Sequence, residues 1–157
     1  MAGNIKLQIC ANADEVATRA AAAFAELISS RPEAVIGLAT GSTPEASYAE
    51  LARLHRDTGL SFAEVTSFNL DEYWGLGGDH DQSYRYFMND RLFKHVDIQT
   101  WNTHVLNGRA RFPELECRSF EHSILAVGGI DLWLLGIGGN GHIAFNEPGS
   151  PVDSRTR

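Results

Sequence analysis

The sequence is poor in cysteine and lysine and has no long apolar run. Only two of its 157 residues are cysteines, Cys10 and Cys117, and they form no CxxC pair, which excludes a disulfide-rich scaffold. No segment approaches the roughly 18 apolar residues that a membrane helix needs, and the first ten residues lack the pattern of a signal peptide. We therefore expect a reduced, cytoplasmic protein that does not enter a membrane.

An excess of basic residues is also absent. Lysine and arginine number 13 against 20 acidic residues, so the net charge is −7. Proteins that bind nucleic acid or anionic lipid are usually basic, so neither partner is expected. The hydrophobic fraction of 43% and the charged fraction of 21% are ordinary for one folded domain, which leaves a small polar molecule as the expected partner.

Short apolar segments alternate with segments of helical periodicity along the chain. Strands are predicted at 5–10, 34–39, 64–70, 103–107 and 130–138, and helices at 13–30, 44–58, 83–96 and 113–129. This order predicts right-handed crossovers and a parallel sheet covered on both faces. Ligands of such open sheets bind beyond the carboxyl ends of the strands. Three loops of unusual composition lie there: 39–44, 69–76 and 136–150.

The first loop, ATGSTP, has features of an anion site. Gly41 lets a ligand approach the backbone, Ser42 and Thr43 offer hydroxyls, and Pro44 suits the first position of a helix. The free N–H groups of that helix would face the loop. A plain helix cap on Thr43 is the alternative, and these residues alone do not decide between the two.

The second loop places two adjacent acids directly after an apolar strand. Asp71 is the first residue past the strand, where a carboxylate could abstract a proton next to a carbonyl. Glu72 is expected to point elsewhere, because neighbours in an extended chain face opposite sides. A solvated acidic loop is the alternative interpretation.

The third loop contains a GxGxxG pattern at Gly136, Gly138 and Gly141. A dinucleotide site is not expected, because this pattern belongs at the first strand of a nucleotide-binding unit and here follows the last predicted one. The same loop holds His142 and Glu147. A carboxylate that orients a histidine ring raises its basicity and fixes its tautomer, so this pair is a candidate for proton transfer.

Together, LATGSTP, FNLDEYWGL and GIGGNGHIAFNEPGS, in this order and spacing, closely resemble the glucosamine-6-phosphate deaminase family. The segments SYRYFMNDRLFKHVDI and SRTR fit the same pattern. The resemblance implies a Rossmann-like three-layer α/β sandwich with a mainly parallel sheet, a fold shared with 6-phosphogluconolactonases. It also implies conversion of glucosamine 6-phosphate and water to fructose 6-phosphate and ammonia without a metal or organic cofactor. On this basis we expect the enzyme to be classed as a hydrolase.

The resemblance also implies roles for individual residues. Asp71 is then the base that moves a proton between C2 and C1, and His142 assists opening of the sugar ring with support from Glu147. The sugar phosphate is expected to lie against Thr40, Gly41, Ser42, Thr43 and Gly138. A lysine Schiff base is not expected, because Lys6 and Lys94 lie in none of the three loops.

Two departures from the family pattern stand out. Asn140 occupies a position where the family often has Asp, so His142 is expected to rely mainly on Glu147. The family also continues beyond position 157. We therefore expect residues 1–157 to form a single sugar-phosphate isomerase/deaminase domain that is the incomplete, N-terminal part of a longer one.

Regulation and competing functions stay open at this point. Ser150 and Arg157 align with an allosteric N-acetylglucosamine-6-phosphate site of regulated members, but Pro151 stands where such members can have a second serine. A 6-phosphogluconolactonase-type hydrolase, a non-catalytic sugar-phosphate sensor and an inactive fragment are the alternatives. The FNEP segment and the absence of a preceding helix-turn-helix favour the deaminase. A homo-oligomer is left open.

Overall fold

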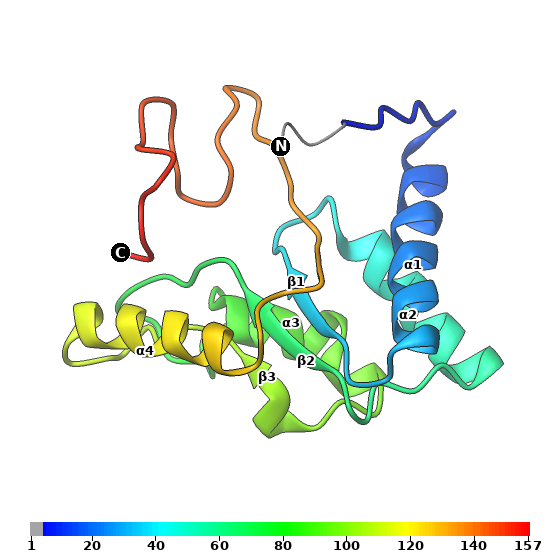
Figure 1. Cartoon of the computed structure of the whole chain (residues 1–157), viewed down its shortest axis with the longest axis horizontal. Coiled ribbons are helices and arrows are strands. Elements are labelled where there is room, and N and C mark those ends of the chain that lie inside the picture. Colours follow the sequence, from blue (N-terminus) through cyan, green and yellow to red (C-terminus); the bar gives the residue numbers. More distant parts are fainter. Residues whose placement is uncertain (1–4) are drawn as a thin grey trace.

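The computed structural model describes residues 5–157 as an α/β fold (Figure 1). Its centre is one four-stranded parallel sheet of strand order β3-β2-β1-β4. The elements in chain order are α1 Ala13–Ser30, β1 Val35–Leu38, α2 Glu45–Thr58, β2 Thr66–Asn69, α3 Tyr84–Arg91, β3 Thr103–His104, α4 Pro113–Ala126 and β4 Leu132–Trp133. Two short 3-10 helices, Phe93–His95 and Thr100–Asn102, lie between α3 and β3.

The central strand β1 organises the sheet. It pairs with β2 along its whole length, from Val35 opposite Thr66 to Leu38 opposite Asn69. The pairs of β1 with β4 and of β2 with β3 each extend over two residues. The parallel sheet predicted from the alternation of elements is therefore confirmed.

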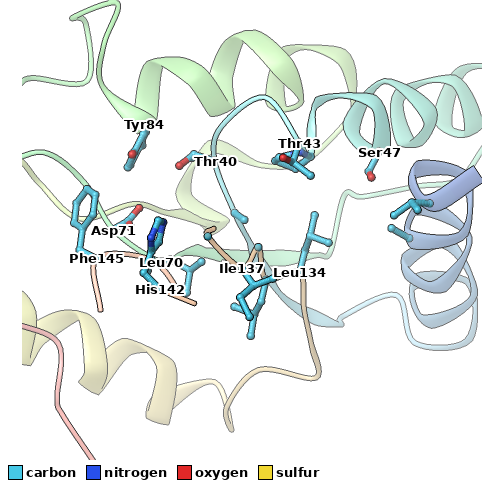
Figure 2. A pocket seen from close by; sticks show the side chains of 18 of the residues that line it. Thr40, Thr43, Ser47, Leu70, Asp71, Tyr84, Leu134, Ile137, His142 and Phe145 are labelled. Carbon is cyan, nitrogen blue, oxygen red and sulfur yellow. The ribbon is translucent and has the colours of Figure 1, made fainter. Parts of the chain in front are cut away.

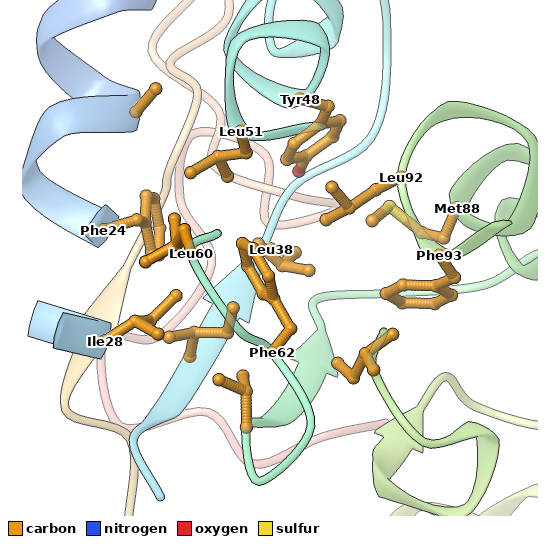
Figure 3. Packing of buried hydrophobic residues seen from close by; sticks show 14 residues of the cluster. Phe24, Ile28, Leu38, Tyr48, Leu51, Leu60, Phe62, Met88, Leu92 and Phe93 are labelled. Atoms are coloured by element: carbon orange, nitrogen blue, oxygen red, sulfur yellow. The ribbon is translucent and has the colours of Figure 1, made fainter. Parts of the chain in front are cut away.

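Alternate residues of the strands pack against helices on opposite faces, which makes three layers. Ile36 and Leu38 of β1 lie in a large buried cluster with side chains of α1, α2 and α3 (Figure 3). Val35 and Phe68 pack on the other face against Phe120 of α4. This period of two is what a strand buried on both faces requires.

Local capping fixes where the helices begin and end. The side chain of Asn12 accepts a hydrogen bond from the backbone of Glu15 at the start of α1, at 2.9 Å. Gly59 ends α2 with a left-handed φ of 77°, which glycine adopts without strain. In the part of the chain that the structure describes, no helix has the length and apolar character to cross a membrane.

Three sequence predictions differ from the structure. The strand predicted at 5–10 is not formed, and Ile5, Leu7 and Ile9 are 96%, 85% and 86% exposed. An alternating pattern becomes a strand only where another strand pairs with it, and none of the described strands does so. The strands predicted at 103–107 and 130–138 are shortened to two residues each for the same reason.

Candidate active site

The three unusual loops meet beyond the carboxyl end of the sheet around one pocket of about 760 Å³ (Figure 2). Its polar lining comes from all three loops and from the start of α3: Thr40, Thr43, Asp71, Tyr84, His142 and Glu147. The other end of the pocket is apolar and is formed by small side chains of α1 together with Leu134, Leu135 and Ile137. The fold thus brings together candidate residues that lie about a hundred positions apart in the sequence.

Two buried side chains hold the loop that follows β1. The Tyr48 hydroxyl of α2 donates a hydrogen bond to the carbonyl of Ala39. The amide nitrogen of Asn69 donates to the carbonyl of Leu38 at 3.1 Å. Gly41 then turns the chain with a φ of 106°, where a residue with a Cβ would be strained. The loop is therefore placed by the core of the fold.

The N-terminus of α2 offers free backbone donors to this loop. Pro44 is the N-cap residue, and no side chain accepts a hydrogen bond from the first turn of the helix. The plain cap on Thr43 is therefore not what the structure shows. Thr43 and Ser47 line the pocket at this point. Unpaired N–H groups and the positive end of the helix dipole favour an anion here.

Asp71 lies between β2 and the pocket and is half-buried. Burial, with a smaller contribution from the negative charge of Glu72, raises the pKa of the Asp71 carboxyl to about 6. A carboxylate with this pKa is ionised at neutral pH and more basic than an exposed one, as proton abstraction requires.

Glu72 points away from Asp71 and fixes the start of α3, as the alternation of neighbours predicts. Its carboxylate accepts hydrogen bonds from the Ser83 hydroxyl at 2.7 Å and from the backbone of Tyr84 and Arg85 at 2.9 and 3.0 Å. Tyr84, the first residue of α3, is thereby held beside Asp71 in the pocket (Figure 2).

The raised pKa of Asp71 predicts a stability gain when the charge is removed. The pKa in the folded state lies above the ordinary carboxyl value, so stability decreases as the pH rises towards about 6 and stays lower above it. Asp71→Asn should therefore raise the midpoint of urea unfolding at pH 8 and change it much less at pH 4. Asp81→Asn, which removes an exposed carboxylate from the segment between β2 and α3, is the control and should leave the midpoint nearly unchanged at both pH values. Equal shifts of the Asp71→Asn midpoint at both pH values would contradict the assignment.

His142 and Glu147 are joined through Asn140. The Asn140 side-chain oxygen lies 2.7 Å from Nδ1 of His142, and its nitrogen donates to Glu147 Oε2 at 2.7 Å. The direct distance from Nδ1 to Glu147 Oε1 is longer, 3.8 Å. Glu147 therefore hydrogen-bonds to Asn140 rather than to the His142 ring, and its carboxylate lies near Nδ1 without a hydrogen bond. An amide oxygen only accepts hydrogen bonds, so Nδ1 carries the proton and Nε2 is free to accept one.

A glycine makes room for the His142 ring. A Cβ at Gly138 would lie 2.1 Å from Cε1 of His142, so only glycine fits beneath the ring. The backbone nitrogen of Gly138 also donates to the carbonyl of His142 at 2.8 Å. The glycines of this loop therefore serve to place the histidine.

Not every predicted residue lines the pocket. Thr40, Thr43, Asp71, Gly138, His142 and Glu147 do so. Gly41, Ser42 and Asn140 lie in the same loops but not on the pocket wall. Ser150 and Arg157 also lie outside the lining and are hydrogen-bonded to each other at 3.2 Å.

Sequence reasoning missed the aromatic part of the site. Tyr73, Tyr84 and Phe145 line the pocket beside Asp71 and His142. Tyr73 and Phe145 lie inside two of the three unusual loops. Tyr73 directly follows Glu72 and Phe145 precedes Glu147 by two residues, and this proximity to acidic residues was the available signal. Tyr84 carries no such signal, because it comes from a helix and reaches the pocket only through the fold.

Comparison with known proteins identifies the family. The model of the family described as glucosamine-6-phosphate isomerases/6-phosphogluconolactonase matches residues 10–155. Glucosamine-6-phosphate deaminase 1 of Giardia intestinalis is 60% identical over 85% of this chain and 50% of its own length. A glucosamine-6-phosphate deaminase of Shewanella woodyi is 54% identical over 98% of this chain and 58% of its own.

Solved structures agree with this match. A monomeric glucosamine-6-phosphate deaminase superposes with a TM-score of 0.94 at 46% identity, over 96% of this chain and 63% of that chain. A 6-phosphogluconolactonase of Thermotoga maritima superposes with a TM-score of 0.72 at 25% identity, over 89% of this chain and 62% of that chain. The Rossmann-like α/β sandwich expected from the sequence is thus confirmed.

The chain belongs to the family of glucosamine-6-phosphate isomerases and 6-phosphogluconolactonases. It spans 50% to 63% of the length of these relatives. The expected class of hydrolase is wrong. The relatives of high identity are named deaminases. The 6-phosphogluconolactonase structure, which is the hydrolase in this comparison, is only 25% identical.

Proposed function

We propose that the site acts on glucosamine 6-phosphate, isomerising the aminosugar and releasing ammonia to give fructose 6-phosphate. The observation that carries this proposal is the half-buried Asp71 opposite the His142–Asn140–Glu147 chain in one pocket. The names of the relatives at 54–60% identity support the same chemistry.

His142 would open the sugar ring. Its Nε2 can take the proton of the anomeric hydroxyl while the bond between C1 and the ring oxygen breaks, and the imidazolium then gives that proton to the ring oxygen. The hydrogen bond of Nδ1 to Asn140 holds the ring in this tautomer. The Glu147 carboxylate, at 3.8 Å from Nδ1, stabilises the imidazolium that forms.

Asp71 would then carry out the isomerisation. Its carboxylate takes the proton from C2 of the open chain, and the electron pair of that bond forms the C1=C2 double bond of an enolamine. The C1 oxygen takes up a proton from the C2 ammonium group in this step. The same carboxyl returns the proton to C1, which leaves an imine at C2. Water adds to the imine carbon and ammonia leaves, so one water is consumed for each ammonia released.

The loop after β1 would bind the phosphate. Thr43 and the first turn of α2 supply a hydroxyl and free backbone N–H groups, and the negative net charge of the chain does not oppose this local attraction. Thr40 lies in the pocket on the side of Asp71 and Tyr84, so we place it against the sugar (Figure 2).

The test is ammonia release from glucosamine 6-phosphate, measured together with fructose 6-phosphate. We expect both products in equal amounts. Hydrolysis of 6-phosphogluconolactone without ammonia release would favour the lactonase instead. Binding of glucosamine 6-phosphate without turnover would favour a sensor domain. Either result would overturn the proposal for this chain.

A charge at position 140 should change the ring-opening step. Asn140→Asp places a carboxylate 2.7 Å from Nδ1 of His142 and stabilises the imidazolium. Because His142 acts as a base and must be neutral to accept a proton, we expect the acidic side of the pH–rate profile to move to higher pH. Asn146→Asp adds the same charge to the same loop and is the matched control. An unchanged profile in Asn140→Asp would exclude an electrostatic role for this position.

Other sequence-based expectations stay predictions. They are a single domain over 1–157 that continues in a longer protein, an allosteric role for Ser150 and Arg157, a homo-oligomer and a cytoplasmic location. The hydrogen bond between Ser150 and Arg157 brings these two side chains together and supports a shared role.

A further inference from the structure

Three aromatic rings join the loop of Asp71 to the loop of His142. Tyr73 follows Asp71 by two residues, Phe145 follows His142 by three, and Tyr84 begins α3. The ring centroids of Tyr73 and Tyr84 are 4.8 Å apart, and those of Phe145 lie 5.4 Å from Tyr73 and 6.2 Å from Tyr84. Each ring therefore contacts the other two at distances typical of aromatic pairs.

Tyr84 is the fixed member of this aromatic cluster. Glu72 accepts a hydrogen bond from its backbone at 2.9 Å, and its hydroxyl donates to the hydroxyl of Tyr73 at 3.1 Å. Burial, with smaller contributions from Tyr73 and from the charge of Asp71, raises the pKa of Tyr84, so the hydroxyl stays neutral. The loop of Asp71 is therefore tied to α3 at two points.

Phe145 is presented by a tight turn. The backbones of Ile143 and Asn146 bond to each other in both directions, at 3.3 and 3.0 Å, and Ala144 between them has a left-handed φ of 52°. Such a conformation is strained for alanine and persists where the surroundings determine it. Phe145 remains 51% exposed, so its defined contacts are the two tyrosine rings rather than a closed core.

We propose that the aromatic cluster of Tyr73, Tyr84 and Phe145 positions the His142 loop against the Asp71 loop, so that both groups face one bound sugar. Figure 2 shows Tyr84 and Phe145 beside Asp71 and His142 at the same end of the pocket. The proposal rests on the proposed function, which gives each loop a reacting group. A displacement of about 1 Å between such groups costs roughly a hundredfold in rate.

Amide hydrogen exchange tests the coupling of the loops without any need for turnover. In Tyr84→Leu, the amides of Ile143 and Asn146 should exchange about tenfold faster, although they lie some 60 residues away in the sequence. Phe145→Leu should accelerate the Leu76 amide, which bonds to the carbonyl of Tyr73, by a similar factor. Phe145→Tyr keeps the ring and should restore the exchange rates of the unmodified chain.

Tyr86→Leu is the matched control, because Tyr86 lies on α3 outside the cluster and should leave both loops unchanged. Unaltered exchange at Ile143 and Asn146 in Tyr84→Leu would overturn the proposal.

With glucosamine 6-phosphate, Phe145→Leu should lower kcat by about ten- to a hundredfold with little change in KM, since the phosphate loop is untouched. A loss confined to KM would also overturn it. If the exchange rates change as expected but the chain releases no ammonia, the proposed function is refuted, while the contact between the two loops through the aromatic cluster still holds.

Discussion

Asp71→Asn is expected to lower ammonia release from glucosamine 6-phosphate by about 10²–10⁴-fold in kcat, because a positioned general base contributes a factor of that size. KM should change little, since Asn keeps the shape of the side chain and the phosphate loop is separate. The pKa of about 6 adds a pH signature: the rate of the unmodified protein should fall about tenfold per pH unit below pH 6.

The matched control is Asp81→Asn, which changes an exposed carboxylate in the segment between β2 and α3. It should keep both the rate and the pH profile. Stability provides a second check, because Asp71→Asn should make the folded chain more resistant to urea at pH 8 while it lowers kcat. A variant that is inactive because it is unfolded would show the opposite.

Phe68→Ala should lower the free energy of unfolding by about 3–5 kcal/mol, the usual cost of removing a fully buried aromatic side chain. Phe68 lies in β2, stacks on His104 with centroids 4.5 Å apart and meets the edge of Phe120 at 5.6 Å. Its loss would open a cavity between the sheet and α4, directly behind the strand that leads to Asp71. Urea unfolding at pH 5 and 8 measures the change.

Phe112→Ala is the control for this prediction. Phe112 precedes α4 and is 56% exposed, with its ring 5.3 Å from the guanidinium of Arg111. Its loss should cost less than about 1 kcal/mol. Similar costs for the two variants would mean that the face of the sheet under α4 is not a packed core.

The fold could be predicted because its signals are local. The continuous apolar run at 34–39, the acids in the first turn of α1 and the glycine after α2 each specify their own element. The strand predicted at 5–10 is not formed, because an alternating pattern, although local, needs a partner strand to become a strand. The predicted lengths of β3 and β4 are too long for the same reason, since each strand pairs with its neighbour over only two residues.

The candidate site was predictable in its loops but not in its contacts. Asp71 and His142 are conspicuous because they follow apolar strands. The place of Asn140 between His142 and Glu147 depends on the turn at Gly141, whose φ is 89°, and no spacing rule contains that geometry. Tyr84 could not be found at all, because Glu72 and the start of α3 bring it to the pocket.

The central claim is that the Asp71 carboxylate moves the proton of C2. It is tested most directly with glucosamine 6-phosphate deuterated at C2, by following the deuterium in the chain and in its Asp71→Asn variant by NMR. The account predicts that the unmodified chain removes the deuterium from C2 and delivers part of it to C1 of fructose 6-phosphate, while Asp71→Asn leaves it at C2. Removal of the deuterium at the same rate in both proteins would contradict it.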